Sequence, residues 1–199
     1  MTAESARYTR TAIAFHWIIA LLIVAMVSVG YYMTGLPRNT PERSFFFNLH
    51  KSIGLLTATV ILLRIVWRLR HAPPSDAPAL PPWQRTAARI NHLFLYVCLL
   101  LMPASGYLGS SFGKFGVKFF GMPLPHWGWE DKGLQDFFVG AHHLIAPIFI
   151  ALIAVHTIAA LYHAYRRDGV CGRIWFRAKE QSPGRSSSTP TWAATDKQR

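Results

Sequence analysis

The chain has 199 residues, of which 51% are hydrophobic and only 15% charged, and its mean hydropathy is +0.21. Soluble domains carry charge on roughly a quarter of their residues, so this composition is not that of a typical soluble protein. The formal net charge of +12 would suit a nucleic-acid-binding protein. The basic residues, however, interrupt long apolar runs instead of forming a stripe, so we expect no nucleic-acid partner.

Four apolar stretches approach the ~20 residues that a helix needs to cross a bilayer. They cover residues 11–33, 46–67, 87–109 and 137–165. We therefore expect an all-α membrane protein, a four-transmembrane-helix bundle over residues 1–178, with a disordered cytoplasmic tail at 179–199. The first stretch lacks a clear signal-peptide cleavage site, so we expect it to be retained. We find no internal repeat.

The loop charges predict the orientation. The N-terminus, the connection between the second and third stretches and the C-terminal region hold 15 Lys and Arg against five acids, whereas the other two loops hold six against four. The positive-inside rule therefore places both termini in the cytoplasm. The connection HAPPSDAPALPPW, residues 71–83, is rich in proline and is expected to be an extended linker.

Nine histidines are present, and at least five fall within the predicted spans, where ionisable side chains are costly and usually functional. His142 and His156 are 14 residues apart on the fourth predicted helix, so they share nearly one face and lie ~21 Å apart along the axis. Ligands so far apart cannot share one metal ion, which excludes the simplest zinc site. The spacing suits two cofactors stacked across the membrane.

Each of these histidines needs a partner at the same depth. His16 lies near the cytoplasmic start of the first helix, at the level of His156, and His50 lies near the external start of the second, at the level of His142. Two axial histidines are what a six-coordinate electron-transfer heme requires. We predict two heme-iron sites, His16–His156 and His50–His142. The alternative is that these histidines are interhelical hydrogen-bonding groups.

A porphyrin lying against a helix needs a small side chain one turn from the ligand. Small residues stand four positions after each of the four histidines: Ala20, Gly54, Ala146 and Ala160. His143 is a rival to His142, but its side chain is rotated by about 100° away from the face of His156. We therefore prefer His142 as the ligand.

Further basic side chains lie near the ends of the predicted spans and are candidates for contacting a quinone or a heme propionate, because guanidinium groups match carboxylates. These candidates are His163, His92, Arg64, Arg68 and, on the external side, Lys51. Positive-inside topology alone would also explain the arginines. We find no nucleotide-binding motif, cysteine cluster or nucleophile–base pattern, so we assign no catalytic residue.

With these residues in place, the chain resembles the bacterial cytochrome b561 family over residues 8–177. The resemblance is carried by FHW with His16, NLHKSIG with His50, NHLFLY with His92, and the fourth helix with His142, His156 and His163. It implies two b hemes per chain, a bacterial inner-membrane location and electron exchange with ubiquinone, and some members oxidise superoxide. The doublet of His142 and His143 departs from the single histidine usual in the family.

Two functions follow from this resemblance. The first is transmembrane electron transfer between a periplasmic donor, with superoxide as one candidate, and membrane ubiquinone, as an oxidoreductase of the respiratory chain. The second is a membrane-anchor cytochrome b subunit of a hydrogenase- or dehydrogenase-type complex. The short loops offer little docking surface for a peripheral enzyme, which favours the first function. A homodimer is compatible with the sequence.

Overall fold

The computed structural model describes residues 8–71, 80–125 and 128–174, so the predicted tail at 179–199 and most of the proline-rich linker lie outside the described residues. Four long helices make up most of this part of the chain: α1 (Arg10–Gly35), α2 (Pro41–Arg70), α3 (Pro82–Ser111) and α4 (Lys132–Arg166). All four are long and apolar enough to cross a membrane, which confirms the predicted all-α class and the four spans.

Each helix extends beyond its predicted apolar stretch at both ends. The N-terminal extensions of three helices end at polar caps: the side chains of Thr9, Thr40 and Asp131 accept hydrogen bonds from the first turns of α1, α2 and α4. Helical hydrogen bonding continues until such a cap satisfies the free amides, whereas hydropathy marks only the part that faces hydrocarbon. The helices are therefore longer than the apolar stretches that hydropathy identifies.

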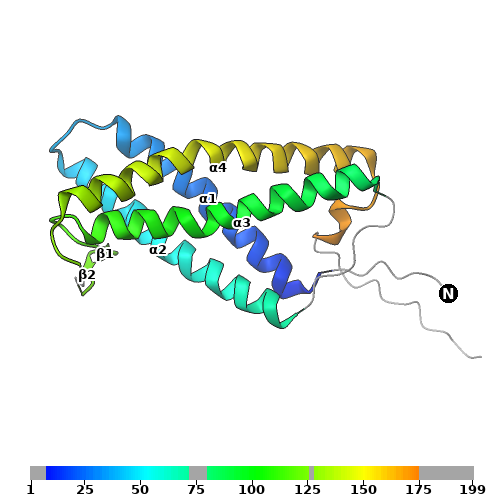
Figure 1. The fold of residues 1–199 in the computed structure, drawn as a ribbon, viewed down its shortest axis with the longest axis horizontal. Coiled ribbons are helices and arrows are strands. Elements are labelled where there is room, and N and C mark those ends of the chain that lie inside the picture. Colours follow the sequence, from blue (N-terminus) through cyan, green and yellow to red (C-terminus); the bar gives the residue numbers. More distant parts are fainter. Residues whose placement is uncertain (1–7, 72–79, 126–127, 175–199) are drawn as a thin grey trace, which may run out of the picture.

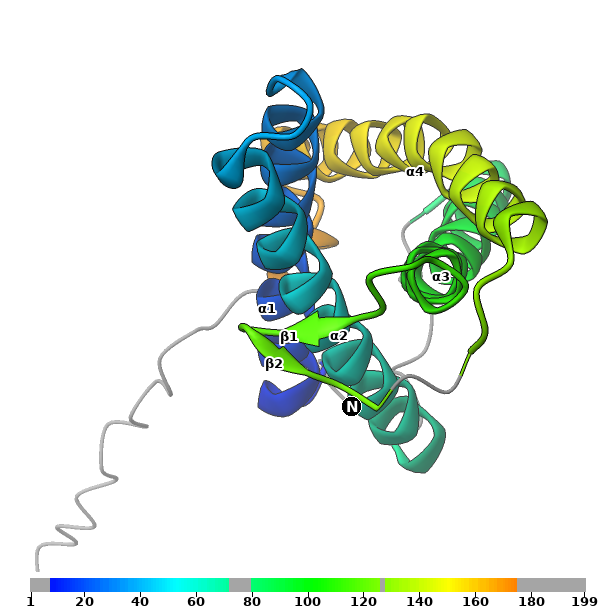
Figure 2. The same ribbon diagram turned by 90° about the vertical axis from the view of Figure 1, so that its left-hand side faces the viewer.

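The helices run alternately up and down, so that α1 starts and α4 ends at the same end of the bundle (Figure 1). They pair as two helical hairpins, α1 with α2 and α3 with α4, joined by contacts between α2 and α3 (Figure 2). In the described part of the chain, no Cα atom of α1 or α2 comes within 8 Å of a Cα atom of α4. The backbone of α4 is therefore separated from α1 and α2 by the side chains and the cavity between them.

A small β-hairpin, β1 (Lys118–Phe119) with β2 (Met122–Pro123), closes the end of the bundle opposite to the start of α1 (Figure 1). Ser52 of α2, which is 1% exposed, accepts a hydrogen bond of 2.8 Å from the amide of Phe120. The neighbouring Lys51 donates from Nζ to the carbonyl of Gly116 at 3.3 Å. The hairpin is thus fastened to α2 directly beside His50.

Large apolar side chains are exposed along the outside of every helix. Examples are Leu21 at 70%, Leu62 at 57%, Leu93 at 62% and Leu161 at 65% exposure. Such a surface is unfavourable in water and favourable against lipid tails. The chain is a multi-pass membrane protein.

Candidate functional site

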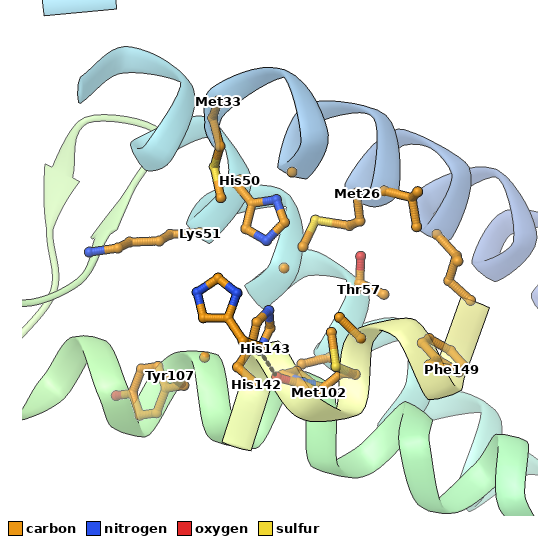
Figure 3. Close-up of a pocket in the computed structure, with 18 of the residues that line it drawn as sticks. Met26, Met33, His50, Lys51, Thr57, Met102, Tyr107, His142, His143 and Phe149 are labelled. Carbon is orange, nitrogen blue, oxygen red and sulfur yellow. Dashed lines mark hydrogen bonds between the residues drawn. The ribbon is translucent and has the colours of Figure 1, made fainter. Parts of the chain in front are cut away.

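A cavity of about 580 Å³ lies between the two helical hairpins, toward the end closed by the β-hairpin. His50 of α2 and the doublet His142 and His143 of α4 face one another across it (Figure 3). The rest of its lining is mainly apolar, with Met26 and Phe149 among the side chains drawn in Figure 3. An apolar cavity with a few convergent polar groups is the usual form of a cofactor site.

The rings of His50 and His142 have centroids 6.3 Å apart, with an angle of 83° between their planes. Metal–imidazole bonds of about 2 Å place two rings on opposite sides of one metal ion with their centroids about 6 Å apart. The separation of this outer pair fits that arrangement. His143 contacts His142 at a centroid distance of 6.4 Å and also lines the cavity.

Hydrogen bonds fix the ring of His142. Its Nδ1 lies 3.0 Å from the carbonyl oxygen of Met102 and 3.2 Å from the hydroxyl of Ser105, both on α3. A metal-binding histidine usually donates its other ring N–H to such a group, which fixes the tautomer and the ring orientation. These contacts therefore leave Nε2 of His142 as the nitrogen available to a metal ion.

The ring of His50 has a different environment. Its Nδ1 is buried and has no hydrogen-bond partner among the described residues. Buried polar atoms are normally satisfied, so an orphaned ring nitrogen beside a cavity is itself an indication of a ligand site.

Two glycines allow helices to approach these rings. A Cβ added at Gly30 of α1 would lie 3.4 Å from Cε1 of His50, and one added at Gly106 of α3 would lie 3.3 Å from Cε1 of His142. The sequence analysis missed both glycines because it searched for small residues on the ligand's own helix. Of those it named, Gly54 faces α1, where a Cβ would lie 3.3 Å from Cε of Met26.

A second group of histidines lies near the other end of the bundle. The rings of His16 on α1 and His156 on α4 have centroids 6.2 Å apart, with an angle of 60° between their planes. His92 of α3 is also close, 5.3 Å from His156. The charges of Arg64 and Arg68 on α2 act on this group, Arg64 on all three rings and Arg68 on His92. The ring centroids of this inner pair are therefore about as far apart as those of the outer pair, and two arginine side chains of α2 lie near it.

The chain turns back after α4 and covers this end. Arg167 adopts a left-handed conformation with φ of 52°, and His163 Nδ1 then lies 2.5 Å from the carboxylate of Asp168. Burial alone would raise the pKa of the Asp168 carboxyl, but hydrogen bonds from His163 and the Val170 amide lower it overall. The segment ends against α1, where Trp17 Nε1 donates to the carbonyl of residue 174 at 3.2 Å.

Comparison with known proteins matches this architecture to one family. A family model described as prokaryotic cytochrome b561 matches residues 7–177. The chain belongs to the prokaryotic cytochrome b561 family. The predicted family membership is thereby confirmed, and the chain is a membrane heme protein of electron transfer.

Individual relatives from the cytochrome b561 family agree with this assignment. The protein named cytochrome b561 homolog 2 of Escherichia coli K12 is 34% identical over 173 residues, which are 80% of this chain and 85% of the relative. Cytochrome b561 homolog 1 of the same organism is 27% identical and covers 87% of this chain and 99% of its own length. A protein of Yersinia pestis named probable superoxide oxidase CybB is 26% identical over 80% of this chain and 89% of its own.

Both histidine pairs fit the b-type heme that the cytochrome b561 family implies. Each pair bridges α4 to a helix whose Cα atoms all lie more than 8 Å from those of α4, and each has the ring separation expected for two ligands of one iron. The orphaned nitrogen of His50 and the approaches at Gly30 and Gly106 belong to the same site.

Proposed function

We propose that the chain carries electrons across the membrane with two b hemes, one held by His50 and His142 and the other by His16 and His156. The observation that carries this proposal is the pair of ring separations, 6.3 Å and 6.2 Å. The two ligand positions on α4 are separated by ~21 Å along the helix axis, which is most of the apolar thickness of a bilayer.

A heme with two histidine ligands supplies one-electron redox chemistry without an open coordination position. The protein side chains would orient the ligands and keep water away from the heme. Met102 and Ser105 hold the ring of His142 in one tautomer and one orientation. The apolar side chains around the cavity exclude water, and the β-hairpin fastened to Lys51 and Ser52 covers the external end.

The predicted topology assigns each histidine pair to one side of the membrane. With both termini in the cytoplasm of a bacterial cell and the chain in its inner membrane, the His50–His142 pair lies on the periplasmic side. The donor enters there, and superoxide is a candidate because a relative is named a probable superoxide oxidase. Ubiquinone is the proposed acceptor at the cytoplasmic end, where His163, His92, Arg64 and Arg68 are candidate contacts for either the quinone or a heme propionate.

The test is a reduced-minus-oxidised spectrum of the purified chain together with its heme-to-protein ratio. We expect b-type bands and two hemes per chain. Absence of the bands, or one heme per chain, would contradict the proposal. Substitutions of the doublet provide a matched pair: His142→Ala should remove one low-spin heme, and His143→Ala should retain both. Co-purification of a peripheral redox subunit would favour the membrane-anchor alternative.

A further inference from the structure

The contacts around the outer pair reveal a repeat that hydropathy does not detect. In both α1 and α3, a methionine, a glycine and a tyrosine follow a histidine after ten, fourteen and fifteen residues. The residues are His16, Met26, Gly30 and Tyr31 in α1, and His92, Met102, Gly106 and Tyr107 in α3. An identical spacing of four residue types on two helices indicates that α1 and α3 occupy equivalent positions.

The structure shows the same equivalence for α2 and α4. Gly30 of α1 lies against Cε1 of His50 at a Cβ distance of 3.4 Å, and Gly106 of α3 lies against Cε1 of His142 at 3.3 Å. The carbonyl of Met102, one turn earlier, lies 3.0 Å from Nδ1 of His142, and the backbone of the equivalent Met26 approaches the ring of His50. The bundle is thus two copies of one helical hairpin, which run in the same direction through the membrane as parallel repeats do.

The repeat makes the two histidine pairs different in kind. His50 and His142 are equivalent residues, so the outer pair joins the two copies symmetrically. His16 and His156 are not equivalent, because the fourteenth residue after His142 is His156, whereas the fourteenth after His50 is Arg64. At the positions equivalent to His16 and His156, the repeat therefore has His92 and Arg64. We call these two residues the counterpart of the inner pair.

The counterpart carries large side chains where the inner pair has small ones. One turn beyond His16 and His156 stand Ala20 and Ala160, and the equivalent residues are Tyr96 and Arg68. Nη1 of Arg68 lies 3.4 Å from the hydroxyl of Tyr96, and the guanidinium lies 5.4 Å from the ring centroid. Small residues leave room for a planar cofactor at one position, and two large ones fill the other.

The counterpart also contains a positively charged guanidinium group without an acidic partner among the described residues. Arg64 is half-buried within α2 and has no ion pair or hydrogen bond among the described residues. A guanidinium within a membrane span is costly unless an anion or a carbonyl pairs with it. Its neighbours Arg68 and His92 add basic groups, and His92 lies 5.3 Å from His156. An anion bound here would therefore lie directly beside the inner pair.

We propose that Arg64, Arg68, His92 and Tyr96 form an anion site that holds a propionate of the inner heme, at the position that the repeat makes equivalent to the inner pair. The inference rests on the proposed function, since it requires a heme between His16 and His156. Two guanidinium groups, a phenol and an imidazole offer the donors that a carboxylate needs.

The experiment compares heme b with its dimethyl ester, which lacks both carboxylates. The full chain is prepared without heme in a His142→Ala background, so that only the inner site is loaded, and each compound is titrated in detergent. Hydrogen bonds to charged groups contribute roughly 1.5–3 kcal/mol. We therefore expect heme b to bind about 10 to 100 times more tightly than the ester, and Arg64→Met to reduce that preference toward one.

Three further variants keep the test decisive. Arg64→Lys retains the charge and should keep part of the preference, Tyr96→Phe removes one donor, and Arg10→Met removes a charge from the same membrane face outside the site and should change nothing. Equal affinity for heme and ester in the parent chain overturns the inference. So does an unchanged preference in Arg64→Met, including the case in which that variant instead loses quinone reduction. Failure of the parent chain to bind either compound refutes the proposed ligands instead.

Discussion

Replacing Gly106 with valine tests whether the close approach of α3 is what positions His142. An alanine Cβ at this position would lie 3.3 Å from both Cε1 and Nδ1 of the ring, slightly inside the ordinary contact range of about 3.5–4 Å. The ring must then move by only a few tenths of an ångström. Because alanine also favours the helix by about 1 kcal/mol over glycine, we expect Gly106→Ala to be nearly neutral in stability.

Valine adds two more methyl groups in the same direction, and the ring cannot yield as far without leaving Met102 and Ser105. Losing those two hydrogen bonds costs about 1 kcal/mol each. Disturbing the groups that orient a metal-binding histidine typically lowers metal affinity by about 10 to 100 times. We expect Gly106→Val to weaken the outer heme by that factor and to leave the inner heme unchanged.

The assay is the heme content per chain, with the two low-spin signals resolved by electron paramagnetic resonance. Gly140→Ala is the matched control, because nothing lies within 4 Å of a Cβ added at this position of α4. Full retention of both signals in Gly106→Val would refute the reasoning. Equal losses in Gly106→Val and Gly140→Ala would do the same, since the effect would then be unrelated to the contact.

Three other substitutions give separate tests. Ser105→Ala removes one of the two hydrogen bonds to the outer ring, so its heme should pass to a heme-scavenging protein about ten times faster, while the inner heme exchanges at the parental rate. Ser52→Ala removes the acceptor of the Phe120 amide, at a cost of about 1 kcal/mol, and hydrogen exchange should accelerate in residues 118–123 only. Because its folded pKa is lowered, the Asp168 carboxylate stabilises the turn beside His163 above about pH 4, and that stabilisation is lost as the pH falls through the folded value. The protection of residues 167–174 against hydrogen exchange, after correction for the intrinsic pH dependence of amide exchange, should therefore fall on acidification in the parent chain and stay constant in Asp168→Asn.

The sequence was sufficient to predict the features that depend on distance along a helix. The rise of a helix relates the 14-residue spacing of His142 and His156 directly to depth, and depth alone selected His16 and His50 as partners. The structure places the same residues side by side. Their role as iron ligands is still a prediction.

The features that depend on contacts between helices could not be predicted in this way. Gly30 and Gly106 lie against histidines on neighbouring helices. Their distance along the chain from His50 or His142 therefore does not identify them. The repeat was missed because only a few residue types recur, spread among interchangeable apolar side chains. The β-hairpin has two residues in each strand, which is too short for an alternating pattern.

The separation of α4 from α1 and α2 has a consequence for biogenesis. A bundle whose halves touch mainly through α2 and α3 has little lipid-excluding contact to bring its halves together, because apolar helices gain no hydrophobic energy from one another inside a membrane. Each helical hairpin could then insert as a unit during synthesis. If the bridging histidines bind heme as proposed, binding of the cofactor would be the step that aligns the two halves.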